Sequence, residues 1–203
     1  MAITTYDELK ASIASWLNRE DLTAVIPDFI TLAEAAISRD LRHFKQEKRV
    51  TTTADERYEN LPNDWLQIQQ VEFTSGGVLS SMASFEMERL RAQDDTAGKP
   101  RFMRLTADQI EFYPTPDSTY DITMQYYARI PTLDDENTSN WLLRDAPDVL
   151  LYGSLVASAP YLNDDARAPV WVSLYRAGID GLNAESSKAR HAGPLTMGVP
   201  RNG

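Results

Sequence analysis

The sequence predicts an α+β protein in which the N- and C-terminal segments form a helical body and the middle segment is a β-rich insertion. Two observations support this fold class. Apolar residues recur at three- and four-residue spacing near both ends of the chain, and they alternate in the middle. We therefore expect residues 1–44 and 145–190 to form one helical body. Residues 45–144 should form a mostly antiparallel β-rich insertion, and residues 191–203 an extended C-terminal tail.

The first two helices are indicated by their start signals. Thr5 can cap a helix over residues 6–18, and Glu8 occupies the reciprocal capping-box position. The second helix should begin at Ile26-Pro27-Asp28, because proline is favoured in the first turn of a helix. Its apolar residues continue at helical spacing to Phe44.

The middle of the chain has the alternating pattern of strands, interrupted by glycine-containing turns. Alternation is clearest between Tyr120 and Ile130, and the strand that begins at Trp65 should end at the Gly76-Gly77 turn. The expected elements are strands at 49–53, 58–61, 65–73, 101–105, 109–113 and 120–130 and a short helix at 84–91.

Two further helices are expected in the C-terminal part. One should begin at Pro147, with Asp145 as its cap, and end at Pro160; the other should begin by Pro169. The first has so little polar surface that the rest of the domain or a neighbouring subunit must cover it. The residues assigned to subunit packing are Leu151, Tyr152, Leu155, Trp171 and Tyr175.

The tail contains two prolines and three glycines from Gly193 onward, so it cannot continue a helix. Leu195, Met197 and Val199 occupy alternate positions, a pattern that suits strand-like docking into a groove of a partner. The alternative interpretation is a frayed end.

The net charge of −10 is concentrated in the middle of the sequence. Residues 50–160 carry 18 acidic and 8 basic side chains, whereas the flanking segments are nearly balanced. Such a surface repels the phosphate backbone, which argues against affinity for free nucleic acid. Asp134, Asp135 and Glu136 form the most concentrated acidic run.

No pattern of catalytic, metal-binding or cofactor-binding residues stands out. The chain has no cysteine and two histidines, His43 and His191, both of which we expect to be solvated. Ser154 lacks a Gly-x-Ser-x-Gly context, so packing or a local hydroxyl hydrogen bond explains it better than catalysis. Neither a phosphate-binding glycine motif nor a segment long enough to span a membrane is found.

Several short strings occur in order over nearly the whole chain. They are Ile3-Thr4-Thr5-Tyr6-Asp7-Glu8-Leu9, Ile26-Pro27-Asp28-Phe29-Ile30, Leu61-Pro62-Asn63-Asp64-Trp65, Gly98-Lys99-Pro100, Tyr126-Tyr127-Ala128-Arg129-Ile130-Pro131 and Tyr152-Gly153-Ser154-Leu155. Together they resemble the head-to-tail adaptor (connector) proteins of tailed bacteriophages.

The resemblance implies a structural virion protein without enzymatic activity. Such a protein forms a homo-oligomeric, dodecameric ring that joins the portal protein to a tail or nozzle protein and continues the DNA channel. It would be made in the host cytoplasm, lie at the head–tail junction, use no cofactor, contact no membrane and let DNA pass without specific binding. Asp134, Asp135 and Glu136 would line the channel. The expected portal- or neighbour-binding residues are Pro194, Leu195, Met197, Val199, Pro200 and Arg201.

Three alternative functions are open. A tail-tube or receptor-binding protein would be another structural component of the same particle, and a small carboxylate-based enzyme would use the paired acids. A DNA-binding module would need a basic surface, for which only Lys45, Lys48 and Arg49 are available. We interpret these three as charges that compensate the dipole at the end of the second helix.

Overall fold

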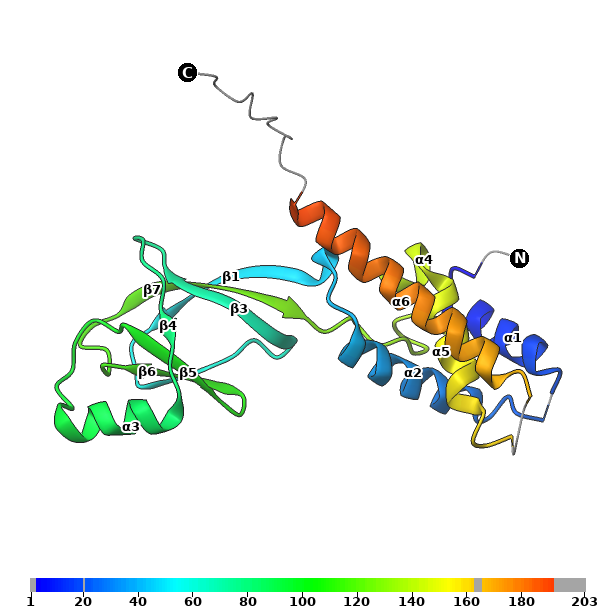
Figure 1. Cartoon of the computed structure of the whole chain (residues 1–203), viewed down its shortest axis with the longest axis horizontal. Helices are drawn as coiled ribbons and strands as arrows, with labels where there is room; N and C mark the ends of the chain where they lie inside the picture. The colour runs from blue at the N-terminus through cyan, green and yellow to red at the C-terminus, as the bar shows by residue number, and fades with distance from the viewer. Residues whose placement is uncertain (1–2, 20, 163–165, 192–203) are drawn as a thin grey trace, which may run out of the picture. The chain divides into compact units, whose positions relative to one another are not determined.

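A computed structural model describes residues 3–19, 21–162 and 166–191 and divides the chain into two compact units (Figure 1). The helical unit comprises Met1–Phe44 and Ile130–Gly203, and the sheet unit comprises Lys45–Arg129. The sheet unit is thus inserted into the helical unit, and the chain crosses between them twice. Helices from both ends of the chain pack together, and the middle of the chain forms two mostly antiparallel sheets, which confirms the predicted α+β class.

The helical unit contains five described helices. They are α1 (Tyr6–Leu17), α2 (Ile26–Asp40), α4 (Trp141–Asp145), α5 (Pro147–Ser158) and α6 (Ala168–His191). The predicted capping box begins α1: the Thr5 hydroxyl accepts a hydrogen bond from the Glu8 N–H, and the Glu8 carboxylate accepts one from the Thr5 N–H.

Helix α5 is the centre of this unit. Helices α1, α2, α4 and α6 contact it, and Leu150 and Leu155 are fully buried among them (Figure 1). Helix α6 approaches α5 so closely at Gly178 that an added Cβ would lie 2.7 Å from Cγ2 of Val149. The apolar surface of α5 is therefore covered within a single chain.

The start of α5 differs from the sequence prediction. Asp145 is the last residue of α4, and the N-cap of α5 is Ala146, which makes no side-chain cap hydrogen bond. The short helix α4 is itself capped by Asn140, whose side chain accepts from the Leu143 N–H. Five residues are too few for a recognisable helical period, which is why α4 was not predicted.

The sheet unit contains seven strands and one helix. They are β1 (Glu47–Ala54), β2 (Tyr58–Asn60), β3 (Trp65–Phe73), β4 (Ser80–Ser81), α3 (Ser84–Gln93), β5 (Phe102–Thr106), β6 (Gln109–Tyr113) and β7 (Tyr120–Ala128). One sheet has the order β1-β7-β3 and the other β2-β6-β5-β4. All pairings are antiparallel except the short parallel pairing of β4 with β5.

One apolar core lies between these two sheets. Alternate residues of β7, from Ile122 to Ala128, enter it together with Ile110 and Phe112 of β6. The opposite side of β6 carries Glu111, which points toward α3. Helix α3 therefore packs on the four-stranded sheet through a face that includes charged side chains.

Candidate interaction surfaces

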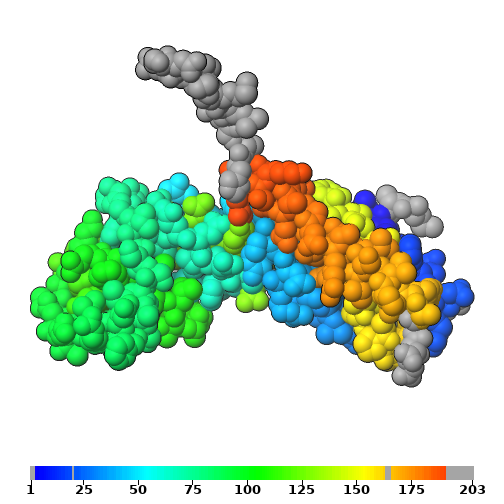
Figure 2. Space-filling model, in the orientation of Figure 1, coloured from blue at the N-terminus to red at the C-terminus, as the bar shows by residue number. Residues whose placement is uncertain are grey.

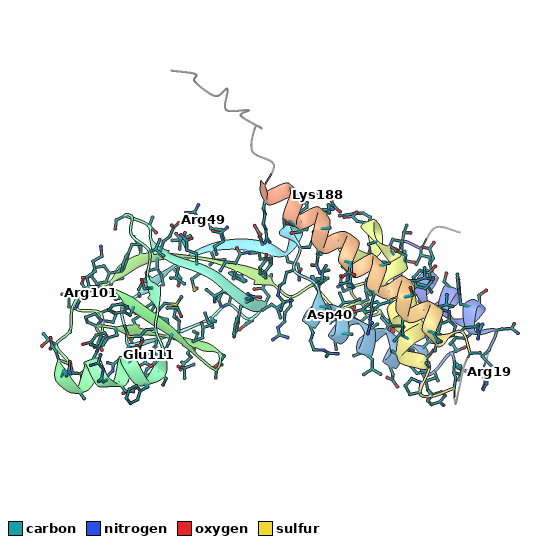
Figure 3. The ribbon with its side chains drawn as sticks, viewed as in Figure 1. Arg19, Asp40, Arg49, Arg101, Glu111 and Lys188 are labelled. Carbon is teal, nitrogen blue, oxygen red and sulfur yellow. The ribbon has the colours of Figure 1, made fainter. Side chains whose placement is uncertain are left out.

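The contact between α3 and the four-stranded sheet is built around a buried carboxylate. The Glu111 side chain on β6 is 0% exposed. Its Oε1 atom lies 2.7 Å from Nη2 of Arg57 and 2.9 Å from Nη2 of Arg91, and its Oε2 atom accepts from Nε of Arg104. Figure 3 shows Glu111 on the side of the sheet that α3 covers. Three guanidinium groups thus converge on one carboxylate.

Burial alone raises the pKa of Glu111, but the hydrogen bonds from Arg57 and Arg104 outweigh it and lower that pKa. Two further carboxylates form ion pairs with these guanidinium groups. Glu88 lies 3.0 Å from Nη2 of Arg104, and Asp95 lies 3.2 Å from Nη1 of Arg91. The network is therefore charge-compensated, and a stabilising role for α3 explains it better than the binding of an anion.

The outward side of α3 carries the most exposed large apolar side chain among the described residues. Phe85 is 79% exposed, one residue after Ser84, whose hydroxyl accepts from Arg104. Leu105 and Val78 in the same unit are also exposed. These residues give the sheet unit apolar side chains on its surface, although single exposed apolar residues are common.

The helical unit has an aromatic cluster where α1, α5 and α6 meet. The rings of Trp16 and Tyr152 are 5.7 Å apart in an edge-on arrangement, and the Arg167 guanidinium donates to the Trp16 carbonyl. The same guanidinium lies 4.9 Å from the ring centre of Trp171. Trp16 is 45% exposed and Val170, on α6, is 59% exposed. Helix α6 runs across the face of this unit presented in Figure 2.

The five residues predicted for subunit packing lie in the helical unit. Four of them, Leu151, Leu155, Trp171 and Tyr175, are buried in the core of the chain itself, and Tyr152 is partly buried. The Tyr175 hydroxyl donates to Asp40 at 3.2 Å, and burial, followed by the charge of Asp40, raises the pKa of Tyr175. Burial of these side chains needs no neighbouring subunit, and their role in packing between subunits stays a prediction.

The acidic run 134–136 lies in the loop that leads into α4, and it belongs to the helical unit. The Asp134 carboxylate accepts from the backbone N–H of Glu136 and of Asn137, and Asp135 pairs with Lys10 at 3.3 Å. All three acids are exposed. Asp134 is thus held within its own loop and Asp135 is paired with a residue of α1, and the position of the run in a channel remains a prediction.

The same loop is tied to α2 by Glu34. Its carboxylate accepts from the Leu133 N–H at 2.8 Å. Burial, reinforced by the nearby charge of Asp134, raises the pKa of Glu34 to about 7, although the hydrogen bond from Leu133 acts in the opposite direction. Because this pKa is near neutrality, the carboxylate of Glu34 gains or loses its charge as the pH passes through about 7.

His43 is buried, which corrects the expectation that it would be solvated. It is 1% exposed, its ring stacks on Trp141 with centroids 5.2 Å apart, and Nε2 lies 3.8 Å from a carboxylate oxygen of Glu185. The segment after α2 turns inward here instead of continuing as an exposed helix. Ser154 matches its prediction, because its hydroxyl donates to the Leu150 carbonyl at 2.8 Å.

Two of the three basic residues considered for DNA binding contact acids of the sheet unit. Lys48 pairs with Asp64, and Arg49, which is labelled in Figure 3, lies 2.7 Å from Glu72. The structure also divides the acidic middle of the sequence between the units. The sheet unit has 14 acidic and 10 basic residues, and the helical unit has 16 and 10. Both units are therefore negatively charged.

The residues predicted to bind the portal or a neighbouring subunit lie outside the described part of the chain. They are Pro194, Leu195, Met197, Val199, Pro200 and Arg201. Among the helices that are described, none has both the length and the hydropathy required to cross a membrane. Within the same residues, no three His, Cys, Asp or Glu side chains group together as a metal site requires.

Comparison with known families decides the classification. The family model of the SU10 adaptor protein matches residues 4–198 and so covers both units. The chain belongs to the SU10 adaptor protein family. It is therefore a structural head-to-tail adaptor protein of a phage, as the sequence resemblance implied. No curated protein matches this adaptor.

The sequence analysis of the adaptor missed the Glu111 network. One signal was present: Glu111 lies between Ile110 and Phe112 in a predicted strand, so alternation places it opposite the core side chains. Its partners are separated from it in the sequence and do not form a motif. Only the folded arrangement of the turn before β2 with α3, β5 and β6 brings them together.

Proposed function

We propose that this adaptor assembles into a homo-oligomeric, dodecameric ring that joins the portal protein to a tail or nozzle protein. The ring lies at the head–tail junction of the virion, has no enzymatic activity and continues the DNA channel. One observation carries the proposal, namely the match of the adaptor family model to residues 4–198. Because the match includes the helical unit and the sheet unit, it supports the role of a complete adaptor and not of a shared subdomain.

The charge of the molecule supports passage of DNA without binding. Each unit has more acidic than basic residues, and the basic side chains Lys48 and Arg49 are paired with acids. A negative wall repels the phosphate backbone and prevents adhesive contacts during packaging and ejection. Asp134, Asp135 and Glu136 are the proposed channel-lining residues; hydrogen bonds within the loop hold Asp134, and the ion pair with Lys10 on α1 holds Asp135.

The proposed function is tested by adding purified adaptor to tail-less capsids that contain the portal. Electron microscopy should show a ring beneath the portal, and native mass spectrometry of the released ring should give the mass of a dodecamer. A protein that binds only to the distal part of completed tails would instead be a tail-tube or receptor-binding component. Capsids that stay bare would overturn the proposal.

The channel assignment is tested in the same particles. The ring map should place residues 134–136 beside the central opening. The variant D134N/D135N/E136Q should dock normally but release DNA more slowly, because neutral walls permit closer contact with phosphates. The control E86Q changes an exposed acid of α3 in the sheet unit. An outer-rim position for residues 134–136 would refute the assignment.

A further inference from the structure

The four edge strands of the two sheets differ in how well they are protected from pairing with another chain. The edges are β1 and β3 in one sheet and β2 and β4 in the other. An edge strand presents backbone N–H and C=O groups to any extended segment. Proteins prevent such pairing with short strands, bulges, prolines or charges.

Three of the four edges carry such protection. Strand β2 has three residues and β4 has two, so neither offers a useful length. Strand β3 is longer, but its register with β7 shifts between Trp65 and Gln67 and again between Ile68 and Gln70. Val78 also forms a bridge with Glu72 near the end of this strand.

Strand β1 has no comparable irregularity. Its eight residues pair with β7 in unbroken register, from Glu47 opposite Tyr127 to Ala54 opposite Tyr120. The charged residues are confined to its first half, and Val50-Thr51-Thr52-Thr53-Ala54 is an uncharged, mostly β-branched segment. The second half of β1 is therefore suited to accept another strand.

The two faces of β1 define what that strand must contain. Val50 packs against the core of the sheet unit but is only partly buried, so the core is incompletely covered at this edge. Thr51 and Thr53 lie on the opposite, exposed face. A complementary strand would be about five residues long, with apolar side chains at alternate positions beside Val50 and small or polar side chains beside the threonines.

We propose that the segment Leu195-Thr196-Met197-Gly198-Val199 of a second copy of this chain adds to β1 as a new edge strand. Its three apolar residues alternate with threonine and glycine, and Pro194 and Pro200 flank it. Proline at the ends of the segment fits an edge strand of this length, because proline cannot donate a ladder hydrogen bond. The apolar side chains would extend the core beyond Val50.

This inference rests on the proposed ring. A contact between the C-terminal segment of one subunit and β1 of the next uses different surfaces on the two partners, and its repetition gives a ring where the rotation between subunits closes. Each contact can be weak by itself, because all of them form together in the closed assembly. The segment would thereby link neighbouring subunits of the adaptor.

Disulfide crosslinking tests the pairing directly, and the absence of cysteine from the natural sequence makes the assay clean. Two single variants, Thr53→Cys and Thr196→Cys, are mixed, assembled and oxidised under mild conditions. A band of two linked chains is expected; Thr51→Cys with Thr196→Cys covers the adjacent register. The control partner Gln69→Cys lies on the bulged edge strand β3 and should give no such band. No crosslink from either β1 variant would overturn the proposal.

The double variant T53C/T196C, mixed with an excess of cysteine-free chain, distinguishes pairing between chains from pairing within one chain. A disulfide inside single chains would refute the role of a second copy. In addition, Met197→Asp should lower ring formation about tenfold, equivalent to about 1.4 kcal/mol, because the carboxylate would enter the core face. In the matched variant Thr196→Asp, the new carboxylate would lie on the face of the sheet opposite the core, so this variant should assemble like the natural protein.

The two proposals fail separately. Rings that dock on portal-bearing capsids but show no crosslink and tolerate M197D would refute strand addition while supporting the adaptor ring. Crosslinked oligomers that leave the capsids bare would refute the ring function at the portal but support the pairing of the segment with β1.

Discussion

The helical unit and the α3 layer of the sheet unit are held together by different kinds of interaction. In the helical unit, α5 is enclosed by apolar side chains from four other helices. Helix α3 buries one apolar residue, Met87, and one charged residue, Arg91, against its sheet, where the Glu111 network provides most of the polar contacts. An apolar core tolerates substitutions that conserve its volume, whereas a buried carboxylate depends on every partner being present.

Removing the central carboxylate should have the largest effect. Glu111→Ala leaves Arg57, Arg91 and Arg104 converging without their common acceptor and should destabilise the sheet unit by about 3–5 kcal/mol. Urea unfolding measures this loss, and hydrogen exchange should show α3 losing protection first. Glu86→Ala, an exposed acid on the same helix, is the control. Equal losses of stability from the two variants would show that the Glu111 network does not stabilise the sheet unit.

A steric change tests whether the helical unit depends on close packing instead. Gly178→Ala would place a Cβ 2.7 Å from Cγ2 of Val149, a buried β-branched side chain with little freedom to move. We expect destabilisation by about 1–3 kcal/mol in thermal unfolding.

Gly181 on the same helix provides a matched control for this substitution. Nothing lies within 4 Å of a Cβ added there. Gly181→Ala should therefore stabilise the protein by about 0.5–1 kcal/mol through helix propensity alone. The same gain at both positions would mean that the contact between α5 and α6 is looser than the structure indicates.

Glu34 is the exception within the helical unit, and its titration should have a smaller effect than the Glu111 and Gly178 substitutions. Its pKa is raised to about 7 from an ordinary value of 4.5, so the folded state retains the proton more strongly than the unfolded state. The stability gained is present below about pH 4.5 and is lost as the pH rises to about 7. Because Glu34 is partly exposed, we expect a change of only about 1–2 kcal/mol.

The substitution Glu34→Gln should remove this pH dependence and make the protein more stable than the natural chain at pH 8. Unfolding by urea at pH 5 and pH 8 measures the difference. Asp28→Asn changes an exposed acid in the first turn of the same helix, where a carboxylate is favourable, and should destabilise slightly at pH 8. If Glu34→Gln left the pH profile unchanged, burial of Glu34 would not control it.

The same contrast explains which features could be predicted from the sequence. Helix α1 with its Thr5–Glu8 box, and strand β7 with its alternation, follow from local patterns that reflect apolar burial. The burial of His43 and the Glu111 network depend on partners far away in the sequence, such as Glu185 for His43 and Arg57 for Glu111. Local patterns contain no information on such pairs.

The functional residues were harder to predict from the sequence than the fold, for a related reason. The acidic run 134–136 and the apolar residues of α5 are visible in the sequence, but a channel wall or a subunit contact is defined by other copies of the chain. The burial of Leu151 and Leu155 shows that an excess of apolar residues in a helix can be satisfied within one chain.

The adjacent ends of the inserted sheet unit have a consequence for the order of folding. Glu47 pairs with Tyr127, and the Gln46 side chain donates to the Ala128 carbonyl at 3.4 Å, so the points where the chain enters and leaves this unit are side by side. Once β1 and β7 have paired, the helices of the two chain ends are joined by a short effective connection instead of a long loop, which lowers the entropy cost of closing it. Early formation of the β1–β7 ladder would therefore accelerate assembly of a helical core whose halves are far apart in sequence.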